Sequence, residues 1–467
     1  MSSFYCGMRF RNELVFCTSL FLIFVFFENP AWATSPEIPT AVDIKLAFID
    51  AFHSVDEAAI DAAYENLEKN YPSDPDLPDF ASELAKLYGF AAALNPSGMQ
   101  REAHRADEIL REFSPGGRFA DRPAAGWKQI KHAQFLIAGG QDTAARMIYR
   151  NLAQNPDDSV FCMAINEVFS GTVLTSNDVA FWKKTIEERL PHMSRVPAGL
   201  KGHLAILRQW DSEGMHPRRL AIEAKARLKG LDYLLDTGET ARGLEEMQKV
   251  KMLLDEYFTL LAEGKAPKEK PRSRGVRYLK LWLAVSELWL NNNQRGLDLV
   301  NELLLHTPQP DPGELSLQAE LKFWQIIAEE RVGAITAKEE EMRLIVLLNE
   351  GHSGPHLVCR IVKMLAQFAD DRNDKTVSYA YYRDLARVLP NPALALWARK
   401  EQAAILPSVS EEKAVPAVTI VSNLFTTEDV VTTVKQSSRL SSGVAGGIRA
   451  FSNWQEPVYK TALDSLE

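Results

Sequence analysis

One pair of histidines has a spacing that could support metal chemistry. His352 and His356 are separated by Ser353, Gly354 and Pro355, and a three-residue gap also separates metal-binding histidines on helices. Glycine and proline disfavour a helix across this gap, and a zinc site needs three or four ligands. We therefore predict no metal site.

Acidic residues cluster at Glu339, Glu340 and Glu341, just after Thr336. Thr336 and Glu339 have the spacing of a capping box, in which two side chains satisfy free amides at the start of a helix. The first turn of a helix also favours carboxylates, so we predict a helix start here and no acid–base site. The same spacing recurs at Ser54 with Glu57 and at Ser97 with Gln100.

The motifs of common enzyme classes are missing from the sequence. It holds no Gly-x-Ser-x-Gly elbow, no phosphate-binding glycine loop and no His-Glu-x-x-His helix. We therefore predict no catalytic residues and no cofactor. Cys162 and Cys359 both lie in apolar helical contexts, where a buried free thiol is the expected state; a single disulfide between them is the alternative.

A basic segment marks a break in the helical pattern at residues 263–277. Prolines and a glycine interrupt it, so we predict an exposed linker between two helical regions. Contact with an anionic partner, such as lipid head groups or an acidic protein face, is the functional alternative. The residues of this candidate contact are Lys265, Lys268, Lys270, Arg272, Arg274 and Arg277.

The first 33 residues have the features of a secretory signal peptide. Arg9 and Arg11 precede the apolar run Leu14–Phe27, and Ala31-Trp32-Ala33 has the small residues of a cleavage site. The apolar run is shorter than the ~20 residues that span a bilayer. We predict export to the bacterial periplasm or beyond, with an uncleaved inner-membrane anchor as the alternative.

A helical hairpin is the clearest structural unit in the sequence. Its first helix carries Trp127, Ile130, Phe135 and Ala138 on the predicted apolar face, and Gly139-Gly140 ends it. The second helix carries Ala144, Ala145, Ile148 and Leu152, and Asn155-Pro156 ends it. Two such helices cannot bury their apolar faces alone, so neighbours of the same kind are expected.

Helix-ending prolines place similar residues in one register. Eight residues before Pro72, Pro96, Pro156, Pro308 and Pro390 stand Tyr64, Tyr88, Ile148, Val300 and Tyr382. This pattern resembles the second helix of a tetratricopeptide repeat, and Trp127 with Ile130 and Trp282 with Val285 resemble its first helix. Lys131 and Gln134 depart from the family pattern. The resemblance implies an all-α helical-hairpin array, or α-solenoid, over residues 41–405; an irregular all-helical globule is the alternative.

The predicted organisation has five parts. They are a signal peptide at 1–33, helical-repeat regions at 34–262 and 278–405, the basic linker at 263–277, and a low-complexity tail at 406–467. The tail is irregular in pattern, without a core of its own, and its residues Phe451, Trp454 and Tyr459 are candidate partner contacts.

Charge and resemblance together define the expected function. The net charge of −9 argues against nucleic-acid binding. Resemblance to tetratricopeptide proteins implies a non-catalytic scaffold that binds a protein or peptide in a cell-envelope complex. Membrane contact through the basic linker is a further expectation. An envelope enzyme acting on peptidoglycan or polysaccharide is the alternative, and a pocket with two facing carboxylates would favour it.

The export prediction has a direct test. Cleavage after Ala33 gives a mature chain that begins at Thr34. Intact-mass measurement of the protein from the envelope fraction of its host should find this chain. A full-length mass in membranes would instead indicate an anchored protein.

Overall fold

The computed structural model describes residues 39–122, 124–193, 196–210, 217–236, 239–265, 273–305, 312–388 and 392–409. All regular structure within these ranges is helical, which confirms the predicted all-α class. No helix in the same ranges is long and apolar enough to cross a membrane. The predicted signal peptide, its predicted cleavage site and the part of the predicted tail beyond Val409 lie outside the described residues.

The helices follow one another with short connections. In chain order the α-helices are α2 (Ala41–Ser54), α3 (Glu57–Asn70), α4 (Leu77–Leu94), α5 (Gln100–Arg111), α6 (Ala125–Ala138), α7 (Asp142–Leu152), α8 (Asp158–Gly171), α9 (Ser176–Arg189), α10 (Ala198–Arg208), α11 (Pro217–Asp236), α12 (Thr240–Ala262), α13 (Arg274–Trp289), α14 (Asn293–Leu305), α15 (Pro312–Arg331), α16 (Ala337–Asn349), α17 (Pro355–Asp371), α18 (Lys375–Val388) and α19 (Pro392–Ile405). Two short 3-10 turns, η1 (Leu190–His192) and η2 (Leu406–Ser408), complete the set.

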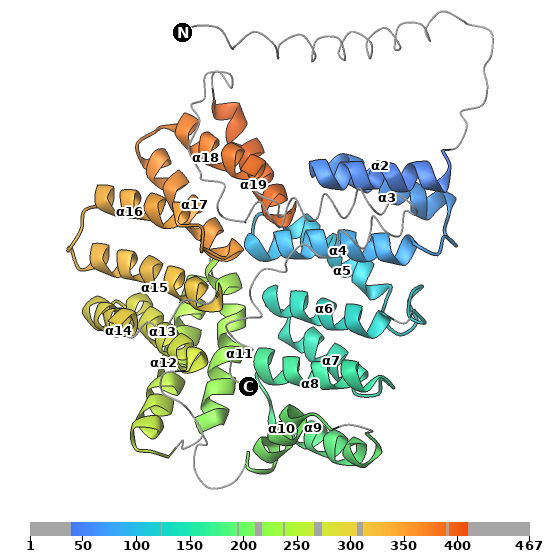
Figure 1. Ribbon diagram of the computed structural model, residues 1–467, viewed down its shortest axis with the longest axis horizontal. Coiled ribbons are helices and arrows are strands. Elements are labelled where there is room, and N and C mark those ends of the chain that lie inside the picture. The colour runs from blue at the N-terminus through green and yellow to red at the C-terminus, as the bar shows by residue number, and fades with distance from the viewer. Residues whose placement is uncertain are drawn as a thin grey trace, which may run out of the picture.

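The helices form two arms that meet at both ends. From α2 to α8 each helix packs on the next, α10 packs on both α8 and α9, and α6 also packs on α4 and on α8. Helix α11 then lies back against α6 and α8, and α12 to α19 continue in the opposite direction (Figure 1). Finally α19 packs against α4, near the start of the chain. The array is therefore closed on itself.

Helix starts depend on local capping, as the Thr336–Glu339 box shows. Both of its hydrogen bonds form at the start of α16. The two predicted serine boxes are wrong. Ser54 ends α2 and bonds back to the carbonyls of Asp50 and Ala51, so Asp56 caps α3 instead. Helix α5 begins after Met99 with no side-chain cap.

The predicted hairpin forms as α6 and α7, with Gly140 at a φ of 72° in the turn. Its first apolar face is partly wrong, because Trp127 is 39% exposed. The gap of five residues from Ile130 to Phe135 does not keep to one helix face. The buried face runs instead through Ile130, Ala133 and Ile137.

The proline register holds in four helices and fails in α7. Tyr64, Tyr88, Val300 and Tyr382 are buried as predicted. In α7, Ile148 is only half-buried and its neighbour Tyr149 is completely buried. Helices α3 and α4 run to two residues before their prolines, whereas α7 ends at Leu152, four residues before Pro156. The segment between the end of α7 and Pro156 is longer than in α3 and α4, and the buried position of α7 is therefore Tyr149 and not Ile148.

The hydrophobic clusters do not follow the predicted division of the chain into two repeat regions. One buried cluster extends from Ile44 to Ala125 and from Leu220 to Ala398, and so includes both ends of the array. A second cluster, from Ile130 to Trp210, fills α6 to α10. The first cluster crosses residues 263–277, so the two predicted repeat regions share one core.

The corrected register makes a stability prediction. Tyr149→Ala should destabilise the chain by about 3 to 5 kcal/mol, because it empties a fully buried site. Ile148→Ala should cost roughly half as much, since that side chain is half-buried. Urea denaturation followed by circular dichroism compares the two variants. A larger loss for Ile148→Ala would restore the original register.

Candidate functional site

Polar contacts join the last helix to the first ones, and we call these contacts the seam. The Nζ of Lys400 on α19 lies 2.7 Å from a carboxylate oxygen of Glu57 and 2.9 Å from one of Glu102. Beside them, Asn95 donates to Glu401 over 2.5 Å, and Arg399 donates to the carbonyl of Val55 over 2.8 Å. Partners about 300 residues apart in the chain are thus held together.

The two carboxylates of the seam respond differently to their surroundings. Burial raises the pKa of the half-buried Glu57, and the neighbouring Glu102 adds to this effect. Burial would also raise the pKa of Glu102, but its hydrogen bond from Lys400 holds it below the usual value. Lys400 therefore lies between two facing carboxylates, which is the arrangement of a structural ion pair.

A cavity of about 390 Å³ lies beside the seam, where the two arms meet. Helices α4, α11, α12, α13, α15 and α17 contribute to its walls. The lining residues are Ala93, Leu94, Pro96, Leu231, Met247, Trp282, Trp289, Phe323, Trp324, Ile327, Arg331, His356, Cys359, Arg360, Lys363 and Met364. Neither Glu57 nor Glu102 is among them.

The described lining residues combine aromatic rings with cations, and none of them is a carboxylate. The guanidinium of Arg360 lies 5.9 Å from the Trp324 ring centre, and that of Arg331 lies 5.9 Å from the Trp289 ring centre. Arg331 also donates to the carbonyl of Leu288 over 2.6 Å. Such a cavity can bind an apolar group and stabilise negative charge beside it.

His352 and His356 have different surroundings in the structure. His352 is exposed, whereas His356 begins the cavity-lining face of α17. Among the described residues, no group of three or more His, Cys, Asp or Glu side chains could hold a metal ion. Cys162 on α8 and Cys359 on α17 are both free thiols, and burial raises the pKa of each.

The basic segment is divided between a loop and a helix. Lys265 is exposed and pairs with Glu263. Arg274 is the half-buried first residue of α13. Arg277 is buried in α13 and pairs with Glu314 at 2.5 Å, so it does not lie in an exposed linker and cannot contact a partner. Lys268, Lys270 and Arg272 lie outside the described residues.

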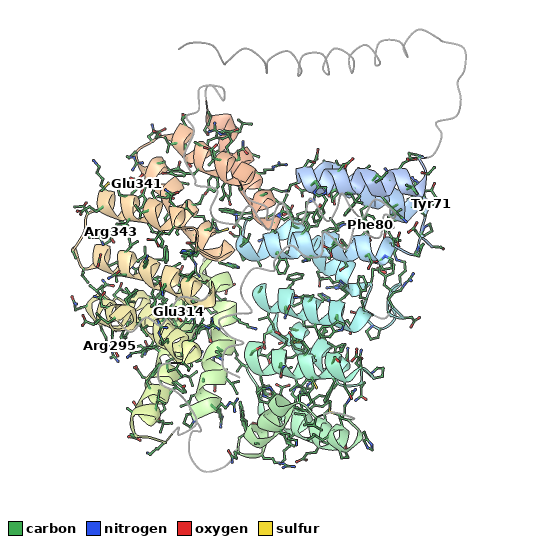
Figure 2. The ribbon with its side chains drawn as sticks, viewed as in Figure 1. Tyr71, Phe80, Arg295, Glu314, Glu341 and Arg343 are labelled. Carbon is green, nitrogen blue, oxygen red and sulfur yellow. The ribbon has the colours of Figure 1, made fainter. Side chains whose placement is uncertain are left out.

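The acidic cluster Glu339–Glu341 lies in the first turns of α16, where its contacts are structural. Hydrogen bonds from Thr336 lower the pKa of Glu339. Burial raises the pKa of Glu340 to about 7. The carboxylate of Glu341 accepts hydrogen bonds from Nη1 and Nη2 of Arg372, at 2.7 and 2.8 Å. Glu341 and Arg343 lie at the outer edge of the arm (Figure 2). These carboxylates therefore lie away from the cavity lining.

Helix α2 has an uncovered apolar stripe. Val42 is 52% exposed and Leu46, one turn later, is 49% exposed. Ile49 follows on the same face and is half-buried. The opposite face packs on α3 and, through Phe48 and Phe80, on α4. Ile49 packs partly against the core, so the uncovered part of the stripe is Val42 and Leu46, on the first described helix of the array.

Sequence reasoning missed the cavity, although α17 carried a signal. His356, Arg360 and Lys363 recur at spacings of four and three on a helix that is otherwise largely apolar. This spacing is that of the polar stripe of an amphipathic helix, and the structure shows that part of the stripe borders the cavity. Trp289 and Trp324 lie in its wall.

Comparison with known proteins gives little to add. No protein-family model and no curated protein matches the sequence. Among solved structures, the crystal structure of yeast Tom70 is similar at 13% sequence identity and a TM-score of 0.23, covering 79% of this chain and 96% of that chain. At this TM-score the likeness is too slight to bear on function.

Proposed function

We propose that the chain is an exported, non-catalytic scaffold that binds a protein partner through the apolar stripe of α2. The stripe is the observation that carries this proposal. In stacked helical arrays the interior faces are covered by neighbours, and the terminal face is normally polar to keep the protein soluble. Closure packs α19 mainly on α4, so α2 keeps a terminal face. The apolar stripe on that face supports a binding site for a further helix.

The neighbour that fits is an amphipathic helix of the partner. Val42, Leu46 and Ile49 follow the spacing at which one helix face contacts another. Exposed carboxylates of Asp43 and Asp50 flank the stripe. A partner helix with an apolar face bordered by lysine or arginine would complement both features.

Export is the second part of the proposal, and it rests on the first 33 residues. Their basic start, apolar run and small-residue cleavage pattern support passage through the inner membrane of a bacterium. The scaffold would then work in the periplasm or outside the cell, attached to an envelope complex. Retention by an uncleaved segment is the alternative placement.

Charged substitutions on α2 test the partner site. The double variant Val42→Lys/Leu46→Lys should lose the partner that the unmodified mature protein captures from its host's envelope fraction, because two buried charges oppose docking. Affinity capture with quantitative mass spectrometry measures the loss, which should exceed about tenfold.

A matched variant controls for general effects of added charge. Met342→Lys/Val346→Lys changes two residues one turn apart on α16, which are 51% and 59% exposed. This variant should keep the partner, and both variants should keep their helical content. Equal capture of the partner by all three proteins, or equal loss of the partner from both variants, would contradict the proposed site on α2.

A further inference from the structure

We infer that the cavity beside the seam binds a free hydrophobic carboxylate, such as a medium-chain fatty acid or an aromatic acid. This ligand site is separate from the stripe on α2 and goes beyond the scaffold function. The inference depends on the size of the cavity, its apolar walls and the sign of its charges.

The size of the cavity fits a small molecule. Its volume of about 390 Å³ lies in the range of about 300 to 1,000 Å³ that small-ligand sites occupy. Six helices contribute to its walls, so a bound molecule would lose part of its contact with water. A hydrophobic ligand gains binding free energy in proportion to the apolar surface that it buries there.

The walls provide the apolar contacts. Trp282, Trp289, Phe323 and Trp324 contribute aromatic surface. The thioethers of Met247 and Met364 contribute polarisable surface that adapts to ligand shape. These side chains favour either a flexible chain or a flat ring system.

The charges define the other end of the ligand. Arg331, Arg360 and Lys363 belong to the lining, and none of its other described residues is a carboxylate. Arg360 and Lys363 lie over the rings of Trp324 and Trp397. Burial raises the pKa of the Cys359 thiol and Glu401 adds to this effect, whereas Lys363 and Arg360 oppose it. The walls at α15 and α17 therefore carry three cations, with the carboxylate of Glu401 nearby. A carboxylate that enters it forms charge-assisted hydrogen bonds, which an alcohol of the same size cannot match.

Three probes of equal chain length test the inference with the full mature protein. Decanoate, decanol and decyltrimethylammonium, each below its micelle concentration, are titrated by calorimetry and by tryptophan fluorescence. Decanoate should bind about 10-fold or more tightly than decanol, since hydrogen bonds to a charged group are worth more than neutral ones. The ammonium probe should bind most weakly.

Two variants locate the binding. Arg360→Met/Lys363→Met should reduce the preference for decanoate over decanol to less than about 3-fold, while the same charge change at exposed positions, Lys183→Met/Lys338→Met, should preserve it. Ala93→Trp, which fills the cavity from a half-buried position, should remove binding of both decanoate and decanol.

Several results would overturn the inference. They are equal affinity for decanoate and decanol, a preference that survives Arg360→Met/Lys363→Met, binding that survives Ala93→Trp, or no binding of any probe. The α2 variant Val42→Lys/Leu46→Lys should bind decanoate normally. Failure of the partner site and failure of the ligand site are thus distinguishable.

Discussion

Packing of α19 against α4 is the contact on which the rest of the structure depends. It joins residues near position 400 to residues near positions 57 to 102, and it turns a row of helices into a closed array. Lys400 alone holds two carboxylates from α3 and α5. Val55, in the left-handed region at a φ of 52°, which is uncommon for a β-branched residue, presents its carbonyl to Arg399.

Closure also builds the cavity. Leu94 and Pro96 line it, and Asn95 between them donates to Glu401 of α19. If α19 left this position, the wall at the end of α4 would lose its support. In an open array each helix pair depends only on its neighbours, whereas here the first and last helices share one hydrophobic cluster. The stability of the two ends is therefore coupled.

Local patterns were enough to predict the helices, and long-range contacts were not. The α6–α7 hairpin follows from apolar spacing, a glycine turn and a proline. Tyr149 was missed because the exit of α7 is longer than that of α3 or α4. Arg277 looked like part of an exposed basic segment, since its partner Glu314 is 37 residues away and nothing in the sequence joins them. The cavity is lined by six helices from distant parts of the chain, and no local sequence pattern predicts how they meet.

Hydrogen exchange across the seam tests closure most directly. In Lys400→Glu, the new carboxylate faces Glu57 and Glu102, and like charges at this distance repel. Amides of α3, α4 and α5 should then exchange faster, while those of α9 and α10, at the far end of the first arm, should not change. Lys184→Glu, at an exposed position on α9, is the control and should leave α3 to α5 unaffected. Unchanged exchange in α3 to α5 of Lys400→Glu would contradict the closed array.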